Sequence, residues 1–352
     1  MSLLLSRLSK LRLEEATLLT RSCFRLLSNG FSSSMFPACS IARAEPCGED
    51  LGKLVIRIDN EYCDTYLEKK VPLELMNRTV TVGASHGWVA TLKEDGIVRL
   101  QDDLNPVASD TNPKRIALPP LVTLPHCQTE VVTNVAMSTS SPEDKDCVVA
   151  VKFLGPQLSL CRPSQFKWTN IMIKNPCFFS SRVMFSEKDG MFRMPGSGGH
   201  LIGSWDRFGK QHKFQRLQFK NLPELTKAKR ELLCSCSVSE HLVESRTTDE
   251  TFLVKWFRKA KRKCLSKMKT RGVMVFKLDE QGKAVYTRDI GELNIFISKS
   301  EAFCLPAGSI PSNFVELLDF DEMTNVCLDG YFIGPGNFTS MAPYFIPPQN
   351  KI

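Results

Sequence analysis

Short segments of alternating apolar and polar residues follow one another along most of this chain. Each is four to eight residues long, rich in β-branched and aromatic residues, and separated from the next by turn residues, which favours strands over helices. The clearest are KLVIRI, TVTVG, GWVATL, GIVRL, CVVAVKFL, RVMF, HLIGSW, HLVES, TFLVKWF, GVMVFKL, AVYTRDI and ELNIFIS. PELTKAKRELL, at residues 223–233, is the one good helix candidate. The body of the protein is therefore predicted to be all-β.

Four glycine turns add a rhythm to these strands. They end at Gly96, Gly190, Gly282 and Gly330, so their spacings are 94, 92 and 48 residues. Glycine accepts the positive φ that tight hairpin turns require. The spacings are close to two, two and one units of 46–48 residues, and a four-stranded propeller blade takes roughly 40 to 50 residues. We therefore predict a β-propeller of about six or seven blades over residues 51–352.

The net charge of +8 is concentrated in two segments. Residues 1–44 carry six Lys or Arg and two acids, and residues 251–271 carry nine Lys or Arg and no acid. The rest of the chain is therefore mildly acidic, at about −5. Because net charge bears on association rather than on fold, each segment needs its own interpretation.

The N-terminal segment, residues 1–44, has the composition of an organellar transit peptide. Its leucines form one stripe on a helical wheel, with Arg7, Lys10, Arg21 and Arg25 beside it, and a serine-rich stretch follows. Import machinery, with mitochondria preferred over plastids or dual delivery, is the partner this predicts. The alternative is an N-terminal helix packed on the domain. The chain contains no run of 18 apolar residues, so no transmembrane segment is predicted.

Several longer phrases resemble a plant family called domain of unknown function 295, also described as a KIB-type β-propeller that is often attached to an F-box. The phrases are HGWVATLKEDGIVRLQDDLNP (86–106), IALPPL (116–121), LSLCRPSQFKWTNI (158–171), MFSEKDGMFRMPGSGGHLIGSWD (184–206), HLVESRTTDETFLVKWF (241–257) and GVMVFKLDEQGKAVYTRDIGELNIFIS (273–298). The resemblance runs from about Leu51 to the C-terminus and implies a propeller that binds proteins.

The resemblance to F-box proteins is incomplete at the N-terminus. Many relatives begin with an F-box that recruits a ubiquitin ligase, whereas here the transit-like leader occupies that place, as in the organellar branch of the family. A propeller without an F-box cannot couple a target to ubiquitin by that route. One alternative reading is therefore a relative of F-box substrate receptors that has lost its ligase-recruiting helices.

The second basic segment connects two predicted strands, so residues 258–271 are predicted to form a long loop. Dense like charge would keep such a loop extended and solvated. Three interpretations stay open: a solvated loop, a contact for RNA or anionic lipid, and a contact for an acidic protein. The candidate binding residues are Lys255, Arg258, Lys259, Lys261, Arg262, Lys263, Lys267, Lys269 and Arg271.

The sequence contains no recognisable catalytic or metal motif. It has neither a G-x-S-x-G nor an H-E-x-x-H pattern, and Cys234, Cys236 and His241 make at most half of a four-ligand zinc site. Thirteen cysteines without paired spacing indicate a reducing compartment. We predict no metal, no cofactor and no catalytic residue.

Three hypotheses for function follow from these observations. The leading one is a non-enzymatic mitochondrial propeller that acts as a protein-interaction module for an unknown partner. The second is an organellar RNA-associated protein that uses residues 255–271. The third is an enzyme with a site in the central channel, which sequence motifs cannot reveal because propeller sites combine residues from distant blades.

Overall fold

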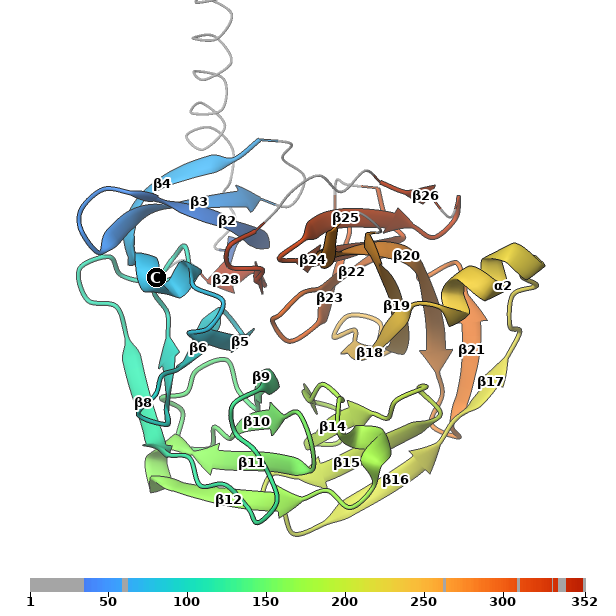
Figure 1. The fold of residues 1–352 in the computed structure, drawn as a ribbon, viewed down its shortest axis with the longest axis horizontal. Coiled ribbons are helices and arrows are strands. Elements are labelled where there is room, and N and C mark those ends of the chain that lie inside the picture. The colour runs from blue at the N-terminus through green and yellow to red at the C-terminus, as the bar shows by residue number, and fades with distance from the viewer. Residues whose placement is uncertain are drawn as a thin grey trace, which may run out of the picture.

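The computed structural model describes residues 35–58, 63–261, 264–308, 311–330, 332–334 and 340–350. Six antiparallel-rich sheets stand around a central axis like the blades of a propeller (Figure 1). This confirms the predicted all-β propeller and sets the blade number at six. The predicted helix is also present, as α2 (Lys227–Cys234), whose first turn is capped by the side chain of Thr226.

The blades follow one another in chain order. Blade 1 contains β27 (Phe345–Ile346), β2 (Cys39–Pro46), β3 (Leu51–Ile58) and β4 (Thr65–Pro72). Blade 2 contains β5 (Thr81–Ser85), β6 (Trp88–Leu92), β7 (Ile97–Gln101) and β8 (Arg115–Pro120). Blade 3 contains β9 (Val132–Met137), β10 (Val149–Phe153), β11 (Gln157–Arg162) and β12 (Lys167–Met172). Blade 4 contains β13 (Met184–Ser186), β14 (Met191–Pro195), β15 (Leu201–Asp206) and β16 (His212–Arg216).

Two blades have a fifth strand. Blade 5 contains β18 (Ser237–Glu244), β19 (Thr251–Lys261), β20 (Cys264–Leu278) and β21 (Lys283–Thr287), and β17 (Gln218–Lys220) pairs in parallel with β21. Blade 6 contains β23 (Phe303–Pro306), β22 (Leu293–Ile297), β24 (Phe314–Asp319), β25 (Glu322–Cys327) and β26 (Phe332–Ile333). Outside the blades, β1 (Met35–Phe36) pairs with β28 (Gln349–Asn350). The short 3-10 helices are η1 (Leu73–Met76), η2 (Pro163–Gln165) and η3 (Pro176–Phe178).

The hydrophobic core is divided among the spaces between neighbouring blades. Strand β10 shows why its sequence is mostly apolar: Val149 and Val151 face blade 2, whereas Ala150 faces blade 4. Successive side chains of a strand point to opposite faces, so a central blade strand covered on both faces is mostly apolar, and the buried Lys152 of β10 donates to the carbonyls of Gly155 and Phe179. Trp88, Trp205 and Trp256 also serve blade packing, because each is buried in one of three such inter-blade clusters.

The spacing of the turn glycines predicted the right fold, although the repeat length inferred from it is wrong. Gly96 joins the second and third strands of blade 2, Gly190 joins the first and second strands of blade 4, and Gly282 joins the third and fourth strands of blade 5. These turns are not equivalent, so the unit of 46–48 residues is incorrect. The inner strands β5, β9, β13 and β18 begin at residues 81, 132, 184 and 237, which are 51 to 53 residues apart.

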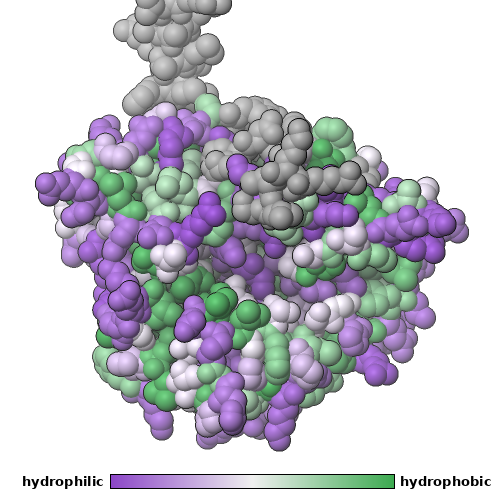
Figure 2. Space-filling model, in the orientation of Figure 1, coloured by the Kyte–Doolittle hydropathy of each residue, from purple (hydrophilic) through white to green (hydrophobic). Residues whose placement is uncertain are grey.

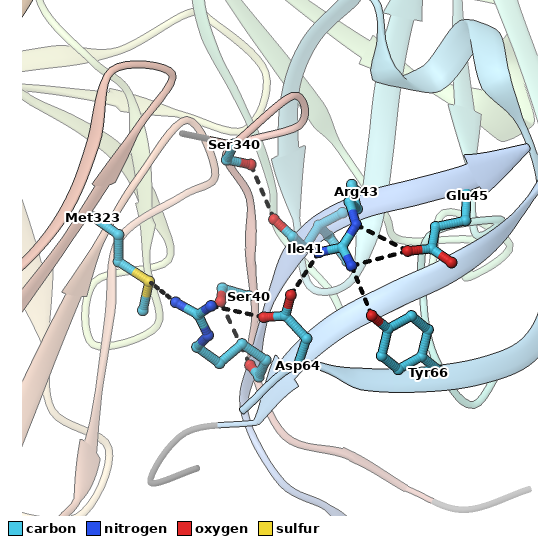
Figure 3. Close-up of polar contacts among 9 residues, drawn as sticks. Ser40, Ile41, Arg43, Glu45, Asp64, Tyr66, Met323 and Ser340 are labelled. Atoms are coloured by element: carbon cyan, nitrogen blue, oxygen red, sulfur yellow. Dashed lines mark hydrogen bonds and ion pairs between the residues drawn. The ribbon is translucent and has the colours of Figure 1, made fainter. Parts of the chain in front are cut away.

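The ends of the chain close the ring. Strand β27, near the C-terminus, pairs with β2, near the N-terminus, and the backbone N–H of Ile41 donates to the carbonyl of Tyr344 at 3.1 Å. The hydroxyl of Ser340 donates to the carbonyl of Ile41 at 2.9 Å. Arg57 of the same blade reaches the sulfur of Met323 on blade 6 at 3.8 Å. Figure 3 shows the neighbouring polar contacts of Arg43 with Glu45, Asp64 and Tyr66.

This closure corrects the predicted boundary between leader and domain. Residues 39–44 were assigned to the leader, but they belong to β2, where Cys39, Ile41 and Ala42 are buried. The propeller therefore starts before residue 51. Residues 1–34, which contain the amphipathic stripe, lie outside the described residues, and the leader itself stays a prediction.

The basic segment is also corrected, because it is not a loop. Strands β19 and β20 form a long hairpin, with Arg258 opposite Thr270 and Lys259 opposite Lys269. The prediction ended the strands too early because it took the charged residues as a sign of a solvated connection. Two of the candidate residues, Arg262 and Lys263, lie outside the described residues.

The closure generates a test by truncation. Removal of residues 1–34 should leave a cooperative thermal transition, whereas removal of residues 1–44 should abolish it, because the second deletion takes buried residues of β2 from between β27 and β3. Circular dichroism melts of the two proteins measure the difference. A stable propeller after the longer deletion would contradict the assigned role of β2.

The central channel as candidate binding site

Lys255 and Arg258, at the base of the basic hairpin, bind other parts of the propeller through their side chains. Lys255 donates to the carbonyl of Gly198 at 2.7 Å and lies 4.3 Å above the ring of Phe219, and burial lowers the pKa of its ammonium. Arg258 forms an ion pair with Asp319 of blade 6. These two candidate residues therefore form contacts within the propeller.

The next candidates are held in the same way. Lys259 donates to the hydroxyl of Ser235, beyond the end of α2, at 2.6 Å. Lys269 pairs with the buried Glu322 of blade 6 at 3.2 Å, and the carbonyl of Arg271 accepts a hydrogen bond from Lys229 of α2 at 3.1 Å. The structure thus places these residues together along one hairpin and engages the cations of Lys259 and Lys269 within the protein, whereas Arg271 is held through its backbone carbonyl.

The remaining candidates give less information. Lys267 is exposed on β20. Lys261 belongs to β19, but its side chain lies outside the described part of the structure. The hairpin as described therefore offers far less free positive charge than its nine Lys and Arg predicted.

A cavity of about 810 Å³ opens at the ends of the inner strands. Blades 2 to 6 contribute to its lining, for example through His86, Ser140, Phe185, Ser245 and Glu301, and Gln349 of β28 completes it. The space-filling view down the ring axis shows hydrophilic and hydrophobic residues mixed around a hollowed centre (Figure 2). No short sequence motif could reveal this site, because its residues come from segments that are far apart in the chain.

Residues Ser298–Ala302, which we call the crossing segment, connect blade 6 to the inner strands of other blades. The backbone N–H of Glu301 donates to the carbonyl of Ala84 at 2.7 Å. Its carboxylate accepts hydrogen bonds from the hydroxyl of Ser85 at 2.6 Å and from the backbone N–H of Phe185 at 2.7 Å. One side chain thereby joins blades 2, 4 and 6 at the wall of the cavity.

The pKa values of two ionisable groups in the cavity wall are shifted so that the neutral forms are favoured. Burial raises the pKa of Glu301 to about 7, although its hydrogen bonds act in the opposite direction. Burial lowers the pKa of His86 to about 4, and the charge of Arg246 adds to this shift. Both oxygens of Glu301 accept hydrogen bonds from the protein, which accounts for its position.

Neither a metal site nor a membrane span is evident where the chain is described. Within the described ranges, no group of three or more His, Cys, Asp or Glu side chains is arranged to hold a metal ion. No helix in those ranges combines the length and the apolar character needed to cross a membrane. The cysteines whose side chains are described are free.

The shifted pKa of Glu301 generates a prediction for stability against pH. Between pH 4.5 and about 7 the folded protein retains a proton on Glu301 that the unfolded chain has lost, so this group makes stability fall as pH rises through that range. Glu301→Gln should remove this contribution, on the order of 2–3 kcal/mol, because an amide does not titrate. The fold should be kept, since the amide can accept from Phe185 and donate to Ser85. Urea unfolding at pH 5 and pH 8 measures the difference.

His86 provides the reason for comparing variant with wild type. The lowered pKa of His86 makes stability rise as pH rises from about 4 to 6.5. Because the wild type and the variant both contain His86, this effect cancels when the two proteins are compared. Glu280→Gln, at an exposed turn, is the matched control and should leave the pH dependence unchanged. An unchanged pH dependence in Glu301→Gln would show that Glu301 does not titrate as described.

Solved structures with a similar arrangement show low overall similarity. A chain of a nidogen/laminin complex matches with a TM-score of 0.39 and 8% identity, over 88% of this chain and 97% of that one. The dihydro-heme d1 dehydrogenase NirN matches with a TM-score of 0.34 and 10% identity, over 92% and 76%. A protein of unknown function from Bacteroides thetaiotaomicron matches with a TM-score of 0.35 and 9% identity, over 83% and 71%. These values carry no argument about function.

The sequence comparison is more specific. A search of the curated proteins finds no match. In contrast, the family described as KIB1-4 beta-propeller matches residues 56–331, which includes strands from all six blades and the crossing segment. This agrees with the resemblance to a KIB-type propeller that the sequence phrases indicated. The chain belongs to the KIB1-4 beta-propeller family.

Proposed function

We propose that this protein is a non-enzymatic interaction module that holds a segment of a partner protein in the channel cavity. The observation that supports this most directly is the lining of the cavity by residues from blades 2 to 6 together with the β1–β28 pair. A concave site formed by a rigid ring suits the recognition of a protruding segment without a change in the fold.

The chemistry of the cavity fits a protein segment. Its wall combines apolar side chains such as Met184, Val107 and Leu305 with backbone and hydroxyl groups. At its rim, Arg246 pairs with Glu187 at 2.5 Å and other opposite charges are paired as well. Because these charges are compensated, we expect an apolar side chain of the partner to provide the anchor and polar rim contacts to set its orientation.

RNA binding through residues 255–271 receives less support. Salt-dependent binding to phosphates needs several accessible cations, whereas Lys255, Arg258 and Lys269 are engaged within the protein. We therefore retain the protein partner as the proposed ligand.

A pair of valine substitutions tests the proposed cavity. Val107→Arg places a charged side chain at the cavity wall, and Val122→Arg makes the same change at an exposed position (61% exposed) that is not part of the cavity lining. Proteins captured from mitochondria by the wild type should also be captured by Val122→Arg but lost with Val107→Arg. With the purified partner, the dissociation constant should rise at least tenfold for Val107→Arg. Equal binding by both variants would exclude the cavity as the contact.

We further propose mitochondrial delivery and a place in the organellar branch of the F-box-associated propellers. The amphipathic, Arg-rich composition of the N-terminal residues supports delivery. Because β2 begins at Cys39, the targeting information should reside in residues 1–34.

A reporter fusion tests the address. Residues 1–34 joined to a fluorescent protein should accumulate in mitochondria, and a version with Arg7, Lys10, Arg21 and Arg25 changed to glutamine should remain outside them, because the membrane potential draws positive charge inward. Fluorescence in plastids would favour the alternative compartment. Cytosolic fluorescence of the unmodified fusion would contradict both.

A further inference from the structure

The side chains of two cations, Arg182 and Lys299, form no ion pair within the described residues. Arg182 precedes the inner strand β13, and Lys299 belongs to the crossing segment, yet neither lines the cavity described above. The Nη2 atom of Arg182 is buried and has no hydrogen-bond partner among the described residues. The ammonium of Lys299 lies 5.8 Å from the centre of the Phe320 ring and forms no ion pair in that part of the chain.

These two cations are close enough to affect one another. After burial, the charge of Arg182 is the largest cause of the lowered pKa of Lys299. Burial also lowers the pKa of Arg182 to about 10, with a further contribution from Arg258. Burial lowers the pKa of His241, and the positive charges of Arg182, Arg258 and Lys299 lower it further. We call the region of Arg182, Arg258, Lys299 and Asp319 the cationic cluster.

The cationic cluster has an excess of two positive charges. Its single carboxylate, Asp319, is already paired with Arg258, and His241 is neutral because its pKa is lowered. Grouping positive charges away from water without counter-charges is costly. An unpaired buried N–H adds to that cost. Asp319 also acts favourably on Arg182 and Lys299, but it is one carboxylate against three cations.

We propose that the cationic cluster binds the phosphate group of a small molecule. A phosphate monoester carries a charge of about −1.5 to −2 near pH 7, which matches the excess of the cluster. A guanidinium offers paired donors that fit phosphate oxygens, and an ammonium adds a third donor direction. Because both side chains are only partly accessible, the cluster suits a compact anion. A nucleic-acid backbone instead needs a row of exposed cations.

Equilibrium dialysis of the full chain against labelled inorganic phosphate at pH 7.5, at constant ionic strength in chloride, tests this assignment. Saturable binding of one phosphate per chain is expected. Arg182→Gln and Lys299→Gln should each raise the dissociation constant at least tenfold, because each removes a charge-assisted hydrogen bond. Arg162→Gln is the matched control, because Arg162 also lies over an aromatic ring, that of Phe208 at 4.5 Å. The Arg162→Gln protein should bind phosphate with the affinity of the wild type.

Thermal unfolding separates loss of binding from loss of fold. Without phosphate, Arg182→Gln and Lys299→Gln should melt at or above the temperature of the wild type, because each substitution relieves repulsion between buried cations. Three results would overturn the proposal: no saturable phosphate binding by the wild type, unchanged affinity in both variants, or a phosphoserine peptide that binds at least tenfold more tightly than inorganic phosphate. The last result would assign the cluster to a phosphoprotein partner.

Discussion

The pairing of β27 with β2 is the contact on which the rest of this structure depends. Each blade covers its apolar faces only by packing against two neighbours, so an open ring would leave the faces of its end blades in water. Strand β27 is two residues long, yet it joins segments about 300 positions apart in the chain. The hydroxyl of Ser340 and the backbone of Tyr344 add to this closure.

The crossing segment has a related role inside the ring. Glu301 contacts Ser85 and Phe185, which belong to blades on other sides of the channel, so it limits how far the blades can move relative to one another. The crossing segment also contributes to two chemically different regions: Ser300, Glu301 and Ala302 line the cavity, whereas Lys299 belongs to the cationic cluster. These regions carry our two proposals, so one propeller is assigned two separate binding sites.

The basic hairpin shows where a sequence pattern is ambiguous. Residues 251–271 contain nine Lys or Arg. This pattern indicated a solvated loop or a phosphate contact, because like charges repel and charge runs are usually exposed. In the structure, Asp319 and Glu322 of blade 6 lie against that hairpin and neutralise Arg258 and Lys269. Those acids are about 60 positions away in the chain, so no local pattern could assign them.

The sequence by itself determined the strands, the propeller class and the family, because alternation of apolar residues and turn glycines are local properties of the chain. Tertiary structure alone decided the blade boundaries, the inclusion of residues 39–44 in β2, and the pairing of the basic hairpin. It also brought Arg182 close to Lys299 and Glu301 close to Ser85. These contacts join residues from different blades, and their distances follow from ring closure, which no periodicity along a single segment encodes.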